Sequence, residues 1–206
     1  MVSAWNNEIL ANPIDKEPKE VFMAYCNEIG DYFEERGFKY FKSKPRIEKR
    51  IGDIIISVNF WSFTMNRMND SVLMEILPYA KSKKLKKWIK TNGVGRNEFL
   101  FGPIIKSNVV SILGHSPKDF ETLMERIHEV FIKQLENFVL IIENPKNIIE
   151  LEENHKGLIL DNFLAYICMD YPDLAELAFE KFKLNIDKTK EQEFLKWREA
   201  NKADFI

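Results

Sequence analysis

The strongest constraint on the fold is a change of hydrophobic period near Gly114. Before this glycine, apolar residues alternate with polar ones or form short extended runs, and after it they recur every three or four residues. Alternation is typical of strands, whereas the longer period is typical of helices. The chain therefore predicts an α+β fold: an antiparallel sheet of four to five strands within 38–113 with an N-terminal helix, followed by an all-helical C-terminal half.

The clearest strand covers 53–64, because its even-numbered residues from Ile54 to Phe60 are apolar and would share one face. Its other face is also rich in apolar residues, so we expect a helix or a partner to cover it. The other predicted elements of this half are a helix over 18–36, strands over 38–51 and 71–79, a lysine-rich helix over 81–90 and one or two strands over 98–113. Short polar turns between the strands favour an antiparallel meander.

A long helix opens the C-terminal half, with Ser116 as the predicted N-cap, Pro117 at the first helical position and Asp119 three residues after the cap. Its apolar stripe comprises Phe120, Leu123, Met124, Ile127, Phe131, Leu135, Phe138 and Ile142. Further helices are predicted after Pro145, over 158–169 and 172–184, and near 188–202. We expect an α+β domain over 1–156 and a helical extension over 157–206 that packs on it as one unit.

The composition is that of a folded soluble protein, with 206 residues of which 45% are hydrophobic and 30% charged. No apolar run approaches the roughly 20 residues of a membrane span, and the first residues lack the basic and apolar regions of a leader, so we expect a cytoplasmic location. Cys26 and Cys168 each lie in a helical apolar pattern, and they are predicted to be buried, reduced thiols.

Charge is distributed very unevenly along the chain. Residues 36–96 hold 15 of the 30 Lys and Arg but only four of the 32 Asp and Glu, so this stretch carries about +11 and the remainder about −13. Clustered charge of this kind steers the association of partners. The predicted binding residues lie in this stretch and comprise Lys42, Arg46, Lys49, Arg50, Trp61, Lys84 and Lys87.

Two kinds of partner fit a basic surface of this composition. An acidic protein could meet a basic face of the sheet. Nucleic acid is the alternative, because cations and aromatic rings interleaved over 38–90 are typical of grooves that hold single strands. Two structural explanations also stay open: lysines on an edge strand oppose aggregation, and acidic helices within 119–153 could cover the basic region.

The sequence contains no pattern specific to catalysis or to a metal site. His115, His128 and His155 occur without the H-x-x-x-H or C-x-x-C spacing of metal ligands. In the basic stretch, Asp53 and Glu48 are the two carboxylates that could serve together as metal ligands. A metal-dependent nuclease would need more carboxylates there. We therefore expect a non-enzymatic protein with neither a cofactor nor a metal ion.

Several motifs follow one another in a characteristic order. A helix precedes G-F-K-Y-F and R-I-E-K-R, a long strand ends in N-F-W-S-F, and a capped long helix ends in F-V-L-I-I-E-N-P-K-N-I-I-E-L. Over 17–155 this order resembles the bacterial domain-of-unknown-function family 4304, although the lysine-rich 81–90 departs from the family pattern. The resemblance implies an α+β sheet with helices, no defined catalytic residues and an interaction protein of the immunity kind.

Overall fold

The computed structural model describes two compact units of the chain. The residues described are 5–92, 99–101, 108–136, 139, 176, 179–180 and 188–200. The first unit comprises 1–50, 56–78 and 105–135, and the second comprises 51–55, 79–104 and 136–206. The boundary expected between 156 and 157 lies outside the described residues and stays a prediction.

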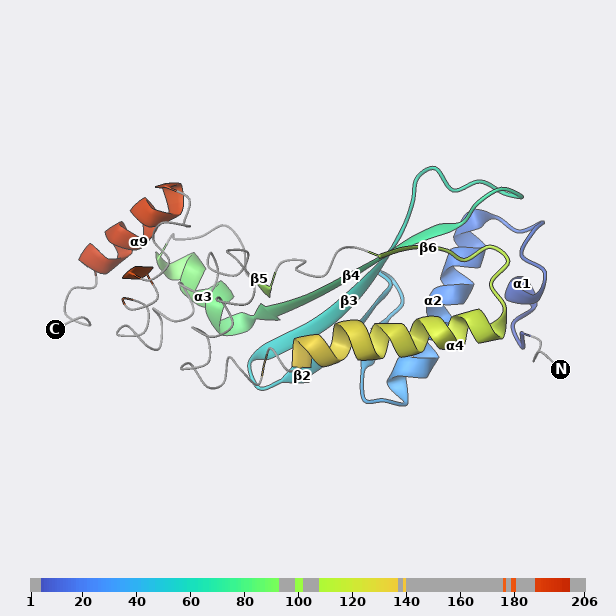
Figure 1. Ribbon diagram of the computed structural model, residues 1–206, viewed down its shortest axis with the longest axis horizontal. Helices are drawn as coiled ribbons and strands as arrows, with labels where there is room; N and C mark the ends of the chain where they lie inside the picture. Colours follow the sequence, from blue (N-terminus) through green and yellow to red (C-terminus); the bar gives the residue numbers. More distant parts are fainter. Residues whose placement is uncertain are drawn as a thin grey trace. The chain divides into compact units, whose positions relative to one another are not determined.

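Up to residue 111 the described elements are two helices, four strands, a third helix and two short strands, and the described elements that follow are helical (Figure 1). They are α1 (Glu8–Ala11), α2 (Pro18–Glu34), β1 (Lys39–Phe41), β2 (Arg46–Ile51), β3 (Ile54–Ser62), β4 (Leu73–Ser82), α3 (Lys83–Asn92), β5 (Phe99–Phe101), β6 (Asn108–Ser111), α4 (Pro117–Arg126), a π-helical stretch over Ile127–Ile132, and α9 (Lys188–Ala200). The predicted α+β class is confirmed. The helices expected after Pro145 and over 158–169 lie outside the described residues, as does most of the one expected over 172–184.

The strands form one sheet in the order β1-β2-β3-β4-β5, and β6 also pairs with β4. Because β3 takes one edge of β4, the two short strands share its other edge: β5 pairs near Ala80, and β6 pairs along Leu73 to Ile76. The stretch expected to form one or two strands thus forms two. Together β5 and β6 take the place of a fifth strand next to β4.

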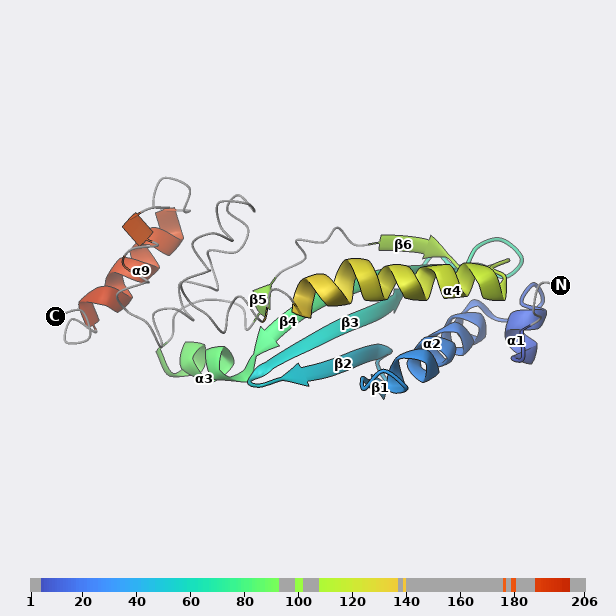
Figure 2. The same cartoon turned by 60° about the horizontal axis from the view of Figure 1, so that its bottom comes forward.

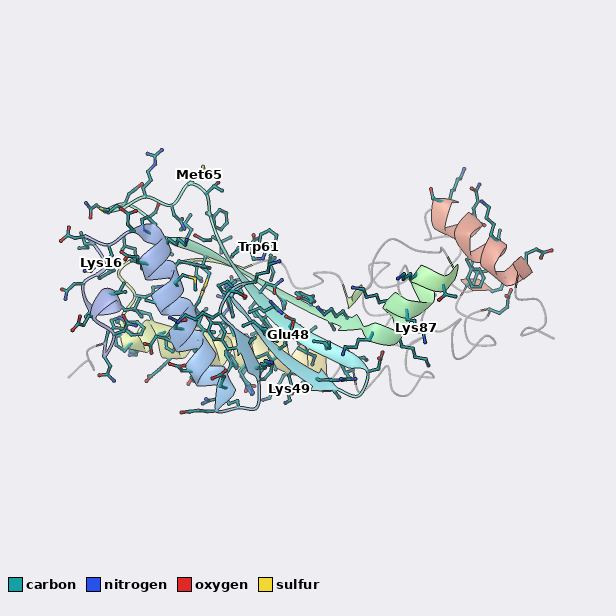
Figure 3. The ribbon with its side chains drawn as sticks, turned by 180° about the vertical axis from the view of Figure 1, so that it is seen from behind. Lys16, Glu48, Lys49, Trp61, Met65 and Lys87 are labelled. Atoms are coloured by element: carbon teal, nitrogen blue, oxygen red, sulfur yellow. The ribbon has the colours of Figure 1, made fainter. Side chains whose placement is uncertain are left out.

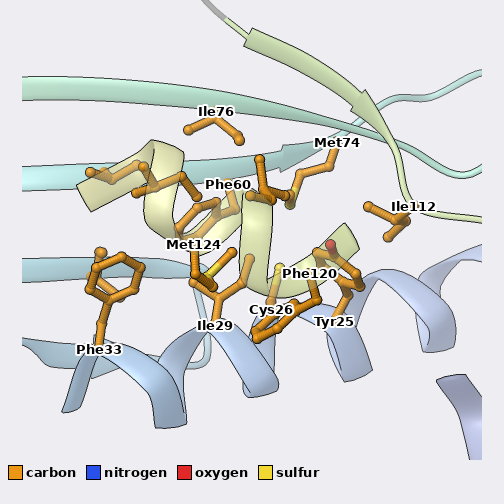
Figure 4. Close-up of a cluster of buried hydrophobic side chains, with 14 of the residues drawn as sticks. Tyr25, Cys26, Ile29, Phe33, Phe60, Met74, Ile76, Ile112, Phe120 and Met124 are labelled. Carbon is orange, nitrogen blue, oxygen red and sulfur yellow. The ribbon is translucent and has the colours of Figure 1, made fainter. Parts of the chain in front are cut away.

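One face of the sheet supplies the core of the first unit. The strand residues buried there are Ile47, Val58, Phe60, Met74 and Ile76, and they share a cluster with Tyr25, Ile29 and Phe33 of α2 and with Phe120, Leu123 and Met124 of α4 (Figure 4). These strand residues alternate along their strands, so they lie on the same face. Helices α2 and α4 therefore cover one face of the sheet (Figure 2).

Gly30 lets α2 lie directly against β1. A Cβ atom at this position would collide with the ring of Tyr40. The Tyr40 hydroxyl donates a hydrogen bond to Asn27 of the same helix at 3.3 Å, and the Tyr40 N–H donates to Glu34 at 3.4 Å. The edge of the sheet that carries the first basic residues is thereby fixed to α2.

Helix α4 begins with the predicted cap. The N–H of Asp119 donates to the Ser116 hydroxyl at 3.3 Å, and the N–H of Ser116 donates back to the Asp119 carboxylate at 2.8 Å. Two backbone donors that the first helical turn leaves free are thereby satisfied. The expected start of the long helix is confirmed.

A π-helical stretch changes the stripe that the sequence predicts for this helix. In it, the N–H of Lys133 donates to the carbonyl of His128, five residues earlier. The wider turn places Ile132 on the buried face next to Phe131, which a regular period does not anticipate. Burial of the stripe from Phe120 to Leu135 is confirmed, whereas the expected members Phe138 and Ile142 lie outside the described residues.

We predict that Phe131→Ala lowers the free energy of unfolding by about 3–5 kcal/mol, because the ring is 2% exposed and its removal would leave a cavity. Val130→Ala is the matched control, since the neighbouring side chain is 38% exposed, and it should change stability by no more than about 0.5 kcal/mol. Denaturant unfolding measures both. Equal effects of the two substitutions would show that the helix presents a different face to the core.

Candidate functional site

We call the face of the sheet that points away from α2 and α4 the outer face. Because side chains alternate along a strand, its residues are those between the core positions. In the first unit they are Lys39, Phe41, Arg46, Glu48, Arg50, Ser57, Asn59, Trp61, Leu73, Glu75, Leu77, Val109 and Ser111. The outer face thus brings cations, carboxylates and aromatic rings together on neighbouring strands.

A cation lies next to Trp61 on one side. The N–H of Phe60 donates to the carbonyl of Pro45 at 2.9 Å, which sets the register of β3 against the segment leading into β2. Residues directly opposite in an antiparallel pair stand about 4.5–5.5 Å apart. Continued by one residue, this register puts Trp61 across from Lys44, which lies in the turn before β2.

On the side of Trp61 that faces β4, its neighbours are an acidic residue and then an apolar one. The N–H of Phe63 donates to the carbonyl of Leu73 at 3.4 Å, so Trp61, two residues earlier, lies across from Glu75 of β4. Glu75 in turn lies opposite Val109 of β6. A row of side chains of different character therefore crosses three strands of the outer face.

Several large apolar side chains near Trp61 are exposed, and Figure 3 labels Trp61 and Met65 among them. The exposed fractions are 59% for Trp61 and 49% for Val109, with 71% for Met65 and 41% for Met68 in the connection between β3 and β4. Asn66 holds this connection in place, because its side chain accepts the N–H of Leu73 at 2.8 Å and donates to the Leu73 carbonyl at 2.9 Å and to Ser62 at 3.0 Å. The exposed side chains thus stand on an ordered backbone.

Arg46 is held in a fixed position on the outer face. Its Nε donates to Glu48 at 2.8 Å, and its guanidinium carbon lies 4.0 Å from the centre of the Phe41 ring. The ammonium of Lys39 approaches the same ring at 5.0 Å. Such cation–π contacts are worth about 0.5–1 kcal/mol when exposed, and they order an otherwise mobile side chain. The guanidinium of Arg46 is therefore held in a defined position.

The seven predicted binding residues fall into three groups. Arg46, Arg50 and Trp61 lie on the outer face, and exposed Lys42 lies in the turn between β1 and β2. Lys49 points to the opposite face, where its ammonium is 5.4 Å from the ring centre of the buried Phe38. Lys84 and Lys87 are exposed on α3, in the second unit. The alternation of β2 and the place of α3 in the second unit therefore divide the residues that the sequence suggests form one basic face.

Sequence reasoning did not single out Val109 or Met65, and it did not pair Glu48 with Arg46 or Phe41 with its two cations. Glu48 and Arg46 are two residues apart in a strand, so alternation alone could have indicated their pairing. The position of Phe41 depends on the register of β1 against β2, and that of Val109 on the pairing of β4 with β6. Neither pairing is visible in a local pattern.

Asp53 has a structural partner at the start of α3. Its carboxylate accepts hydrogen bonds from the hydroxyl of Ser82 and from the N–H of Lys84, the latter at 3.2 Å. Ser82 in turn accepts the N–H of Leu85 at 3.0 Å, as an N-cap does. The residue weighed above as a metal ligand thus caps a lysine-rich helix, where a carboxylate favourably meets the positive end of the helix dipole.

His115 joins three segments of the first unit. Its Nδ1 lies 2.9 Å from the Tyr25 hydroxyl, and its carbonyl accepts the indole N–H of Trp5 at 2.9 Å. Burial lowers the pKa of His115, although the nearby Asp119 carboxylate opposes this effect. Burial raises the pKa of Tyr25. Both groups are therefore neutral at pH 7, and the contact serves to hold the chain before α4 against α2.

Other reactive groups have ordinary surroundings. Cys26 is buried, which raises the pKa of its thiol and makes it a poor nucleophile, while Cys168 lies outside the described residues. His128 contacts the neighbouring Glu129 at 3.0 Å. Among the residues that the structure describes, no three His, Cys, Asp or Glu gather as metal ligands would, and no helix has the length and apolar character needed to cross a membrane.

Comparison with protein family models, with characterised proteins and with solved structures finds no match to this chain. The resemblance to family 4304 therefore stays a prediction.

We predict that the free energy of unfolding decreases as the pH falls below about 6.5, because burial holds the pKa of His115 below its usual value of 6.5 and the unfolded chain then binds a proton that the folded chain resists. His115→Gln should weaken this dependence between about pH 5 and 6.5. Denaturant unfolding over a pH series measures both proteins.

His128→Gln provides the control, because it removes a histidine that is not part of the contact with Tyr25. Its dependence on pH should match that of the wild type. An unchanged dependence in His115→Gln would show that other groups cause the loss of stability.

Proposed function

We propose that this chain is a non-enzymatic protein-binding module whose outer face, centred on Trp61, receives an acidic protein. The observation that carries the proposal is the 59% exposure of Trp61 on an ordered strand, in register with Lys44. Tryptophan and arginine are the residue types most enriched at the energetic centres of protein interfaces. An exposed tryptophan beside a preorganised arginine fits such a centre.

The charge of the hairpin formed by β1 and β2 supports an acidic partner. Residues 38–51 include six Lys and Arg and one acidic residue, Glu48, which Arg46 already engages. Lys42 and Lys44 are exposed and form no ion pair with a carboxylate among the described residues. A surplus of this kind accelerates encounter with an acidic surface and suppresses binding of basic ones.

A protein suits the outer face better than a nucleic acid does. The Phe41 ring already contacts two cations, so it offers less open surface for stacking a base. Glu48 and Glu75 lie on the same face and would repel phosphates. Exposed apolar side chains such as Val109 would not contribute to binding the phosphate backbone of a nucleic acid. The immunity-like role implied by the family resemblance is consistent with this proposal.

The test begins with isolating the partner from host cells with the full chain, producing it separately and measuring its dissociation constant by calorimetry. Trp61→Ala should weaken binding by about 2 kcal/mol or more, roughly thirtyfold in the dissociation constant, because the ring would fill a pocket on the partner. Lys42→Glu with Lys44→Glu should weaken binding most at low salt.

Lys16→Glu with Lys19→Glu is the matched control, since it makes the same change of charge at exposed positions outside the outer face. It should leave the affinity unchanged. The proposal fails if no protein depends on Trp61 and the hairpin lysines. It also fails if those residues instead carry binding of a labelled oligothymidine.

A further inference from the structure

Helix α3 presents the densest group of cations among the described residues. Its ten residues include five lysines, Lys83, Lys84, Lys86, Lys87 and Lys90, and all five are exposed. The sequence has no Asp or Glu between Glu75 and Glu98. The proposed protein-binding surface of the first unit does not include this helix.

Three of these lysines form a stripe along the helix. Lys83, Lys87 and Lys90 are spaced by four and three residues, which places them on one side of the helix. At a rise of about 1.5 Å per residue, they follow one another by about 6 and 4.5 Å along the axis. A row of ammonium groups at such intervals can contact successive charges of a linear polyanion.

The cap of α3 fixes this row. The carboxylate of Asp53 accepts the N–H of Lys84 and the Ser82 hydroxyl, so it satisfies the first turn of the helix. Leu85 of the same helix is fully buried. The lysine stripe therefore projects from a helix whose position is set at one end.

We propose that α3 binds the phosphate backbone of nucleic acid through Lys83, Lys87 and Lys90, without reading the sequence of bases. Lysine is a point charge suited to phosphate, and it is depleted at protein interfaces, where arginine is enriched. A membrane surface fits less well. Leu85 is the apolar residue of α3 whose side chain the structure describes, and it is buried in the protein, so it would not enter a bilayer. This binding goes beyond the proposed function and uses a different unit.

The test measures fluorescence anisotropy of a labelled oligothymidine titrated with the full chain over a series of salt concentrations. The wild type should bind, with log affinity falling linearly against log salt as counterions are released. Replacing Lys83, Lys87 and Lys90 together by Gln should lower the affinity at least tenfold and reduce the slope by about 2, since each lost phosphate contact removes about 0.7 for a single strand. Gln keeps a similar helix propensity, and circular dichroism checks the fold.

The matched control replaces Lys16, Lys19 and Lys118 by Gln, which removes the same charge from exposed positions outside α3. The control should retain the wild-type affinity and slope. The proposal is overturned if the wild type does not bind, or if both triple variants lose affinity equally, because net charge would then explain the effect. Binding of anionic vesicles that requires the α3 lysines, without binding of oligothymidine, would also overturn it.

Discussion

Burial of alternate strand residues beneath two helices is the interaction on which the rest of the structure depends. Ile47, Val58, Phe60, Met74 and Ile76 enter the core together with side chains of α2 and α4. Since neighbouring residues of a strand point to opposite faces, a slip of one residue in any of these strands would exchange the core and surface residues of that strand. The same packing that stabilises the first unit therefore decides which residues form the outer face.

The predictions from sequence were most reliable where a local pattern determines structure. The strand around Ile56 and the cap at Ser116 follow from alternation and from the hydrogen-bonding needs of a helix terminus, and both are confirmed. The extra buried residue Ile132 was missed, because a π-helical turn interrupts the regular period. Glu75 and Val109, which lie beyond Trp61 across the sheet, also escaped prediction, because the pairing of distant strands brings them together.

The cations of the basic stretch have two different surroundings in the structure. Around Arg46 the cations contact an aromatic ring and a carboxylate, and apolar side chains lie nearby, which is the composition of a protein interface. Around Lys87 the exposed cations are lysines on one short helix, which is the composition of a site for phosphates. The sequence combined these regions in one basic stretch, whereas the alternation of β2 and the separate unit of α3 distinguish them.

The central claim is that the outer face is open at Trp61, and solvent exposure of that side chain tests it most directly. Fluorine NMR of protein containing 5-fluorotryptophan, with signals assigned by Trp→Phe substitution, reports the isotope shift of each ring between H₂O and D₂O. We predict a large shift for Trp61 and a smaller one for Trp5, which packs against Tyr25 and donates to the His115 carbonyl. A Trp61 signal as protected as that of Trp5 would show that the outer face is covered and would contradict the account.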